Sequence, residues 1–273
     1  MKFTGERLIN GMEGQIKLEH LHRYALALPF VKEKVVLDIA CGDGYGTSLL
    51  AKSALKIEGV DIDYETIKYA SKKYKDQKLK FTVGDILNIP FEKNYFDIVV
   101  CFETFEHVDE HDKLLNEIKR VLKDDGILIM STPEKSVYSD SRNYSNKFHK
   151  KEMYLNEYED LLRSQFDFNQ FLYQKFVVAS LIYESSKCGI NEINGNYDSI
   201  SINKEFQPKY MVSISSKYKL DLISSSIFND VNQIDLIINK IKSSYDFKIG
   251  KLILSPFRFF KNTILKFFSE KIK

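Results

Sequence analysis

The sequence predicts an α/β protein whose mostly parallel sheet is covered by helices on both faces. Short apolar runs alternate with amphipathic segments between residues 35 and 132, and such alternation is typical of strand–helix–strand units. A glycine-dense loop, Asp38-Ile39-Ala40-Cys41-Gly42-Asp43-Gly44-Tyr45-Gly46, begins in the first apolar run, and Asp61 ends the second. Because glycine has no Cβ, a ligand can approach the backbone of such a loop closely.

Five strands and three helices are expected in this part of the chain. The strands are 35–39, 57–60, 79–83, 96–101 and 127–131, each an apolar run of strand length. The helices are 46–54, 65–74 and 112–122. Asp63 stands where it can cap the second helix, and Asp124-Asp125-Gly126 is a stop signal for the third.

Composition indicates a globular protein with one ample core and a small additional segment. The 273 residues are 44% hydrophobic and 29% charged, and the formal net charge of +2 is too small to indicate a nucleic-acid partner. Cys41, Cys101 and Cys188 form no CxxC, so we expect no disulfide framework, no metal site and a reducing cytoplasm. No run has the length of a signal peptide's apolar core or a membrane span, so neither is expected.

The stretch from 35 to 132 resembles the class I S-adenosylmethionine-dependent methyltransferases. Residues 38–46 match their glycine motif, and Asp61 matches their ribose-binding acid. Residues 83–86 match the adenine segment, 96–108 the fourth strand with its following turn, and 114–132 the next helix and strand. The resemblance implies a Rossmann-like, doubly wound sheet of seven strands, with the last strand antiparallel. Its two further strands are expected near 166–176 and 210–215.

The resemblance also implies S-adenosylmethionine as the cofactor. The backbone of residues 41–44 is expected around the methionine moiety, Ile62 under the adenine, and Asp85 at its exocyclic amine. Asp38 commonly braces the glycine loop in this family, so its role is structural as much as direct. The full set of expected cofactor-binding residues is Asp38, Cys41, Gly42, Gly44, Asp61, Ile62, Gly84, Asp85, Ile86, Phe102 and Arg23. The D-x-D of residues 61–63 also occurs in metal-dependent glycosyltransferases, but the upstream glycine loop favours the methyltransferase interpretation.

Catalysis by such a protein requires mainly that donor and nucleophile be held in line, because the sulfonium supplies the reactivity. A hydroxyl acceptor would need a general base. His107, after the fourth strand, and His149, in a connection expected to form a lid over the cofactor, are the predicted catalytic residues. Alternatively, His107 only organises its turn, and His149 is an ordinary surface residue.

The N-terminal segment carries the main indication of substrate. Ile16, Leu21, Tyr24, Ala25 and Leu28 are expected to form a helix face against the sheet. Arg7, His20 or Arg23 is expected to close over the cofactor's carboxylate; the alternative is a solvated Glu19–Arg23 pair. The pairing of T-G-E-R with E-H-L-H-R-Y resembles methyltransferases of bacterial surface-polysaccharide assembly, which favours O-methylation of a sugar or glycan intermediate.

The predicted organisation has three parts. Residues 1–33 cap the cofactor, 34–216 form the methyltransferase domain with a lid at 133–160 and an insertion at 184–207, and 217–273 form a helical region. Its tail, 251–273, holds six basic residues and one acidic residue, with apolar residues at helical spacing. Such a tail suits the inner face of an anionic membrane or a partner protein, although docking on its own domain is an alternative.

Two other functions compete with the glycan interpretation. The same motifs suit methylation of a quinone-type or other small molecule, for which the tail would serve equally. A non-catalytic methyltransferase-like scaffold is the other alternative, which the intact Asp38, Gly42, Gly44, Asp61 and Asp85 disfavour. Nucleic-acid methylation is not expected, since residues 101–104 after the fourth strand read Cys-Phe-Glu-Thr rather than an N-P-P-Y-like tetrad.

Overall fold

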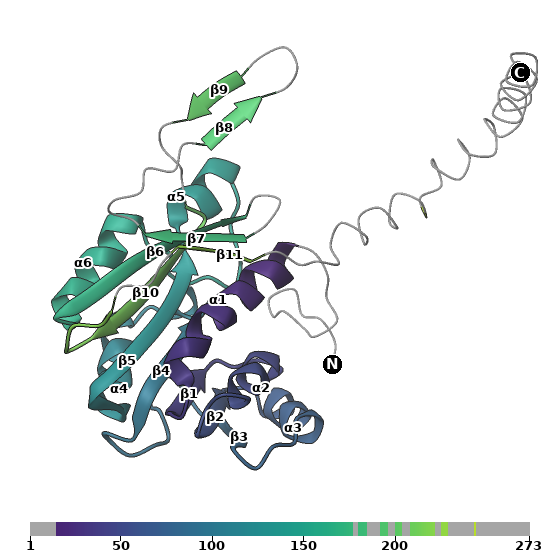
Figure 1. The fold of residues 1–273 in the computed structure, drawn as a ribbon, viewed down its shortest axis with the longest axis vertical. Coiled ribbons are helices and arrows are strands. Elements are labelled where there is room, and N and C mark those ends of the chain that lie inside the picture. The colour runs from purple at the N-terminus through teal and green to yellow at the C-terminus, as the bar shows by residue number, and fades with distance from the viewer. Residues whose placement is uncertain are drawn as a thin grey trace, which may run out of the picture. The chain divides into compact units, whose positions relative to one another are not determined.

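The computed structural model describes residues 15–176, 180–184, 192–195, 200–203, 208–221, 225–228 and 243. The chain divides into two units, Met1–Asn229 and Asp230–Lys273, and every helix and strand described below belongs to the first. Arg7, most of the predicted insertion and the tail 251–273 lie outside the described residues (Figure 1). The predicted division into residues 1–33, 34–216 and 217–273 therefore stays a prediction.

A nine-stranded sheet forms the centre of the first unit, in the order β11-β7-β6-β10-β5-β4-β1-β2-β3 (Figure 1). β1 pairs in parallel with β2 and β4, and β10 lies antiparallel between β5 and β6. The seven strands from β3 to β6 thus confirm the predicted class I sheet with its antiparallel last strand. The strands are β1 (Val35–Ile39), β2 (Lys56–Asp61), β3 (Leu79–Val83), β4 (Phe96–Phe102), β5 (Leu122–Pro133), β6 (Phe168–Phe176), β7 (Ser180–Glu184), β10 (Tyr210–Ser216) and β11 (Ser226–Phe228).

Two features of the strands were not expected. β7 and β11 add an antiparallel edge beyond β6, and β8 (Glu192–Gly195) pairs with β9 (Ile200–Asn203) in a separate hairpin. The predicted stop signal at 124–126 lies inside β5, where the pairing with β4 shifts register. The chain therefore passes from helix to strand at Leu122 and bulges at the Asp-Asp-Gly sequence.

The helices are α1 (Gln15–Val31), α2 (Tyr45–Ala51), α3 (Tyr64–Lys73), α4 (His111–Val121), α5 (Lys135–Tyr138) and α6 (Leu155–Gln165), with 3-10 turns η1 (Phe105–His107) and η2 (Asp140–Arg142). The three predicted helices are thus present as α2, α3 and α4. Asp63 caps α3 as predicted, since its carboxylate accepts from the amides of Glu65 and Thr66. Within the described ranges, no helix combines the length and the apolar character needed to cross a membrane.

The core lies on both faces of the sheet, as the alternation of side chains along a strand requires. Val36 of β1 packs with α1 and α2, whereas its neighbour Leu37 packs with α4 and α6. Both residues are fully buried. Because both faces are covered, the exposed rim of the sheet is where a ligand can enter, at the carboxyl ends of β1, β2 and β4.

The predicted apolar face of α1 is largely wrong. Ile16 is 50% exposed and Leu28 is 36% exposed, whereas the charged Glu19 and Arg23 are fully buried. The reason is the polar surface that α1 covers. Glu19 and Arg23 find hydrogen-bonding partners on β6 and beside β10, so these side chains pack inward in place of aliphatic ones.

Candidate functional site

The glycine loop that follows β1 has unobstructed space beside the backbone of Gly42. Gly42 and Gly44 have φ of 57° and 81°, in the left-handed region that favours glycine. A Cβ on Gly42 would meet nothing within 4 Å, whereas one on Gly44 would lie 2.6 Å from the ring of Phe81. Gly44 is therefore needed for close packing of the turn, and Gly42 leaves room for a ligand against the backbone.

Asp61 holds this loop and adjoins the space in front of it. Its buried carboxylate accepts from the amide of Gly42 at 3.1 Å and from that of Asp63 at 2.9 Å. Each carboxylate oxygen has two acceptor positions, so the hydroxyls of a ribose can bind in addition to the loop amide. Ile62, the next residue, is 68% exposed, which suits an apolar plate for an adenine ring.

Asp38 joins three elements beneath the loop. Its buried carboxylate accepts from the hydroxyl of Thr47 on α2 at 2.7 Å and from that of Tyr24 on α1 at 3.4 Å. Burial raises the pKa of Asp38 to about 7, against the bonds from Thr47 and Tyr24, which favour the anion. These contacts link β1 to α1 and α2, while the expected role of Asp38 at the glycine loop stays a prediction.

The other expected cofactor residues line the same edge of the sheet or pack behind it. The amide of Gly84 donates to the carbonyl of Asp61 at 3.1 Å, and the exposed Asp85 accepts from the amide of Leu87 at 2.8 Å. Ile86 packs partly into the core, and Phe102 meets Tyr24 edge-on at 5.2 Å. Cys41 is buried, and its amide donates to the carbonyl of Val60 at 2.9 Å.

Arg23 brings a buried positive charge to this edge from α1. One of its amino groups donates to Gln174 at 2.7 Å, and the other lies 3.7 Å from the carboxylate of Glu103. Its Nε and Nη2 are buried and have no hydrogen-bond partner in the described part of the protein. Because unsatisfied buried donors are costly, a bound carboxylate such as that of methionine fits this position.

The other N-terminal residues have different surroundings. Burial, and then the charges of Arg23 and Lys209, lower the pKa of His20 well below its ordinary value, so this imidazole is neutral near pH 7. Glu19 binds Lys209 at 3.1 Å and is fully buried, so the alternative of a solvated Glu19–Arg23 pair is wrong. Of the three expected cationic residues, Arg23 therefore fits the cofactor's carboxylate better than His20, and Arg7 is outside the described residues.

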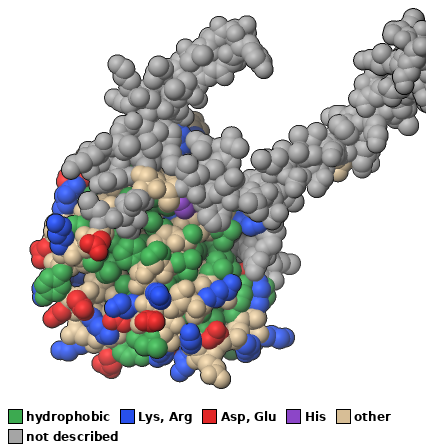
Figure 2. Space-filling model, in the orientation of Figure 1, with side chains coloured by type: hydrophobic (Ala, Val, Ile, Leu, Met, Phe, Trp, Pro, Cys, Tyr) green, Lys and Arg blue, Asp and Glu red, His purple; other side chains and the backbone are tan. Residues whose placement is uncertain are grey.

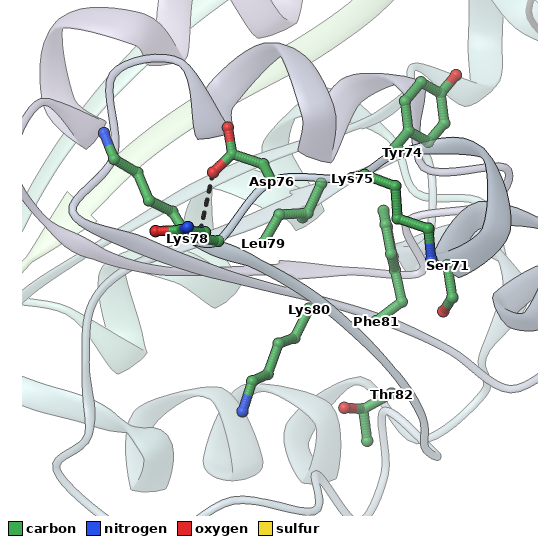
Figure 3. A pocket seen from close by; sticks show the side chains of 10 residues that line it. Ser71, Tyr74, Lys75, Asp76, Lys78, Leu79, Lys80, Phe81 and Thr82 are labelled. Atoms are coloured by element: carbon green, nitrogen blue, oxygen red, sulfur yellow. Dashed lines mark hydrogen bonds between the residues drawn. The ribbon is translucent and has the colours of Figure 1, made fainter.

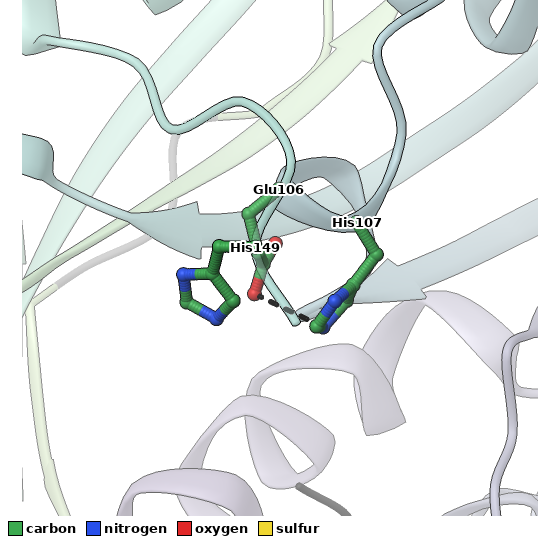
Figure 4. A group of neighbouring side chains, drawn as sticks. All are labelled: Glu106, His107 and His149. Atoms are coloured by element: carbon green, nitrogen blue, oxygen red, sulfur yellow. Dashed lines mark ion pairs between the residues drawn. The ribbon is translucent and has the colours of Figure 1, made fainter. Parts of the chain in front are cut away.

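A second group of polar side chains lies at the same edge, after β4. Glu106 and His107 belong to η1, and His149 comes from the connection after η2. One ligand atom from each of the three lies within 4.8 Å of the others, with the carboxylate of Glu106 between the two imidazoles (Figure 4). The two predicted catalytic histidines are thus brought together, with ring centroids 5.1 Å apart.

Three residues of this region were missed in the sequence. Glu106 is buried, and burial together with the nearby Glu103 raises its pKa well above the ordinary range. Glu103 has a φ of 50°, a strained left-handed conformation of the kind that clusters at functional sites. Tyr138 of α5 stacks on His149 at 5.4 Å, and burial followed by Glu103 raises its pKa to about 12. The spacing of Glu103 and Glu106 directly after a strand was the available signal.

The two groups of residues are neighbours. Arg23 contacts Glu103, which lies three residues before Glu106. Burial raises the pKa of the Cys101 thiol, and the charges of both Glu106 and Asp38 add to that effect. A ligand at the glycine loop and a second molecule beside His149 would therefore sit at one edge of the sheet.

A surface hollow elsewhere is separate from this site. It has a volume of about 840 Å³ and lies between the end of α3 and the edge strand β3, as Figure 3 shows. Its lining runs from Ser71 to Thr82 and includes none of the expected cofactor or catalytic residues.

Comparison with known proteins shows what the glycine-loop region is similar to. Residues 37–130 match the family model described as a methyltransferase domain. Over this region the chain is similar to methyltransferase domains. The chain is similar to a probable S-adenosylmethionine-dependent methyltransferase of Mycolicibacterium smegmatis, with 29% identity over 167 residues, covering 60% of this chain and 64% of that protein.

Other relatives carry more specific names. A ubiquinone biosynthesis O-methyltransferase of Actinobacillus pleuropneumoniae is 29% identical over 44% of this chain and 56% of that protein. A norajmaline N-methyltransferase of Rauvolfia serpentina is 36% identical over 34% of each chain. The chain thus spans less than two thirds of the length of the curated relatives that it matches here.

Solved structures confirm the fold. The YcgJ protein of Bacillus subtilis superposes with a TM-score of 0.54 at 18% identity, covering 73% of this chain and all of that one. A possible histamine N-methyltransferase of Thermotoga maritima gives a TM-score of 0.54 at 19% identity, covering 74% and 90%. At these identities the likeness concerns the class I methyltransferase fold alone.

Proposed function

We propose that the protein transfers a methyl group from S-adenosylmethionine to a hydroxyl oxygen of a small-molecule acceptor. The observation that carries this proposal is the grouping of Glu106, His107 and His149 at the sheet edge that also holds the glycine loop. A hydroxyl is a poor nucleophile until its proton is removed, and this group provides imidazole nitrogens and a carboxylate for that purpose.

The residues have distinct tasks in this scheme. When bound, S-adenosylmethionine supplies a methyl group on a sulfonium, and transfer of that methyl to the acceptor oxygen leaves S-adenosylhomocysteine and releases the hydroxyl proton. Asp61 and the loop backbone hold the nucleoside and methionine parts, while the unsatisfied donors of Arg23 bind the carboxylate. His107 and His149 each donate from Nδ1, so Nε2 is the nitrogen that accepts a proton.

For the acceptor itself, a sugar or glycan intermediate of cell-surface polysaccharide is our proposal. It is supported by the resemblance of the N-terminal T-G-E-R and E-H-L-H-R-Y segments to methyltransferases of that pathway. The acidic side chains of Glu103 and Glu106, whose charges add to the effect of burial in raising the pKa of Tyr138, also suit a polyhydroxylated substrate. The basic tail 251–273 would hold the protein at the inner membrane face, where such intermediates are assembled.

A quinone-type acceptor is the second candidate. It is favoured by the similarity to ubiquinone biosynthesis O-methyltransferases, which covers 44% of this chain. The aromatic ring of Tyr138 against His149 would suit a planar ring as well as a sugar.

The test begins with the cofactor. Calorimetry should show S-adenosylmethionine binding to wild type, and Asp61→Ala should weaken it by roughly 1–3 kcal/mol, since the mutation removes a charged acceptor. Asp125→Asn, an exposed acid in the β5 bulge, is the matched control and should bind normally.

The acceptor is tested by measuring the release of S-adenosylhomocysteine with sugar nucleotides and with catechol-type phenols. If folded wild type does not bind the cofactor, the proposal is wrong; if it binds but methylates neither class, the hydroxyl acceptor is wrong.

A further inference from the structure

We propose that Glu106, His107 and His149 bind a divalent transition-metal ion, which in turn holds the acceptor's hydroxyl oxygen. The binding of the ion concerns these three residues alone. The contact of the ion with the acceptor rests on the proposed function, because it requires that an acceptor be methylated at this edge of the sheet.

The donor atoms are already close to a coordination geometry. They lie within 4.8 Å of one another, and Nε2 of His107 is 3.9 Å from the carboxylate of Glu106. An ion with bonds of about 2.1 Å needs neighbouring ligands about 3 Å apart. Rotations that move the side-chain tips by about 1 Å would therefore close the group around an ion.

Both imidazoles are oriented as metal ligands usually are. Nδ1 of His107 donates to the carbonyl of Phe148 at 3.0 Å, and Nδ1 of His149 donates to the carboxylate of Glu152 at 2.5 Å. When Nδ1 carries the hydrogen-bonding proton, Nε2 is the ring nitrogen that can coordinate an ion. A metal-binding histidine typically makes such a bond from its other nitrogen, because the bond fixes both the tautomer and the ring orientation.

Backbone contacts hold the two halves of the site together. The carbonyl of Glu106 accepts from the amides of Lys150 and Lys151 at 2.9 and 3.1 Å. These bonds tie the segment that carries His149 to the turn that carries His107. The third ligand is fixed as well, since Oε2 of Glu106 accepts from the hydroxyl of Thr132 at 3.1 Å. The site is therefore assembled in the fold, although His149 lies over 40 residues after Glu106 and His107 in the sequence.

The chemistry of the donors suggests the kind of ion and its use. Two imidazoles and one carboxylate suit Mn²⁺, Fe²⁺, Co²⁺ or Zn²⁺, whereas Mg²⁺ prefers an all-oxygen set. Three protein ligands leave positions on the ion for an oxygen of the acceptor. A bound cation also lowers the pKa of a coordinated hydroxyl, which would make the acceptor a better nucleophile near neutral pH. With Nε2 of both histidines bound to the ion, the hydroxyl proton would pass to solvent water, so the two histidines act as ligands in this scheme and replace their role as general base.

The experiment measures metal binding directly, on tag-free, chelator-treated full-length protein. Co²⁺ is titrated while its visible absorption is recorded, since the bands report nitrogen and oxygen coordination, and Mn²⁺ binding is followed by electron paramagnetic resonance. We expect one site in wild type and loss of that site in His149→Ala. Glu152→Gln should bind about 10–100-fold more weakly, as is usual for a residue that orients a ligand.

Two controls keep the test independent of folding and of catalysis. Glu110→Gln, at an exposed position of the turn before α4, should bind metal like wild type. All variants should bind S-adenosylmethionine normally, because the cofactor residues lie elsewhere along this edge. Absence of a Co²⁺ and Mn²⁺ site in wild type, or equal binding by His149→Ala, overturns the metal site. Methyl transfer that is unchanged by chelation overturns the catalytic use of the ion but leaves the proposed function standing. Metal binding without any methyl transfer overturns the proposed function and the catalytic use of the ion, but leaves the metal site standing.

Discussion

Burial determines the behaviour of the acid at the start of the glycine loop. Asp38 is 1% exposed and bonds to Thr47 and Tyr24, yet burial still raises its pKa to about 7. An acid whose pKa is higher in the folded state than in the unfolded chain binds more protons in the folded state over the intervening pH range. The contribution of Asp38 to the free energy of unfolding is therefore fully present below about pH 4, where the residue is protonated in both states. This contribution is lost as the pH rises to about 7.

This reasoning predicts a pH-dependent effect of Asp38→Asn. The amide stays neutral, so the variant should gain stability relative to wild type as the pH rises from about 4.5 to 8, by on the order of 4 kcal/mol at most. Urea unfolding at several pH values measures the difference. The exposed variant Asp125→Asn should show no such trend. A constant difference between Asp38→Asn and wild type across this range would mean that Asp38 ionises normally in the folded protein.

Motif residues and long-range partners differ in how far the sequence reveals them. Asp38, Gly42 and Asp61 were predicted because strand, turn and acid follow one another at fixed intervals. The contact of Arg23 with Glu103 joins residues 80 positions apart, and the stacking of Tyr138 on His149 depends on how a polar connection folds back. No local pattern encodes such contacts, so they became visible only in the structure.

At the scale of elements, the first helix is docked through one close contact. A Cβ on Gly46 of α2 would lie 1.9 Å from the ring of Tyr24 on α1. The same ring meets Tyr45 edge-on at 5.6 Å and Phe102 at 5.2 Å. The missing side chain at position 46 thus lets α1 approach α2 and reach the sheet edge, where α1 places Arg23.

We therefore predict that Gly46→Ala destabilises the protein by about 1–3 kcal/mol, the usual cost of overpacking. Helix propensity alone would favour alanine, so a loss of stability must come from the clash. The neighbouring Ser48→Ala is the control and should be nearly neutral. In a double-mutant cycle, Tyr24→Leu should recover part of the loss, because the smaller side chain frees the space. Urea denaturation gives all four values, and additive effects would show that the two residues do not interact.

Elements differ in predictability for a physical reason. β1 was predicted to the residue because it is a central, mostly apolar strand that ends at turn residues, and the edge strand β3 because its alternating apolar residues end at Gly84. The three-residue β11 is too short to show a period. The face of α1 that packs on the sheet was predicted from apolar residues. In the structure this face also includes the charged Arg23, which bonds to Gln174 of β6, and Glu19, which accepts from Tyr210 at the start of β10.

For the whole molecule, the distribution of charge is more informative than the total. The formal net charge is only +2, and acidic and basic side chains are interspersed over the described part of the face in Figure 2. Residues 251–273 alone carry six basic residues against one acidic residue. Their formal charge of +5 therefore outweighs a net charge of −3 on the remainder of the chain, and it is combined with phenylalanines at helical spacing.

This asymmetry predicts binding to anionic bilayers through the tail. Each basic residue near such a surface contributes about 1 kcal/mol, a contribution that salt screens, whereas aromatic burial is insensitive to salt. Full-length protein should therefore sediment with anionic vesicles more than with neutral ones, and high salt should reduce this binding without abolishing it. A chain ending at Gly250 should remain in the supernatant but still bind S-adenosylmethionine, because its cofactor residues lie between positions 23 and 102. Equal sedimentation of the two chains, or no preference for anionic lipid, would assign the tail to the protein's own domain or to a partner subunit instead.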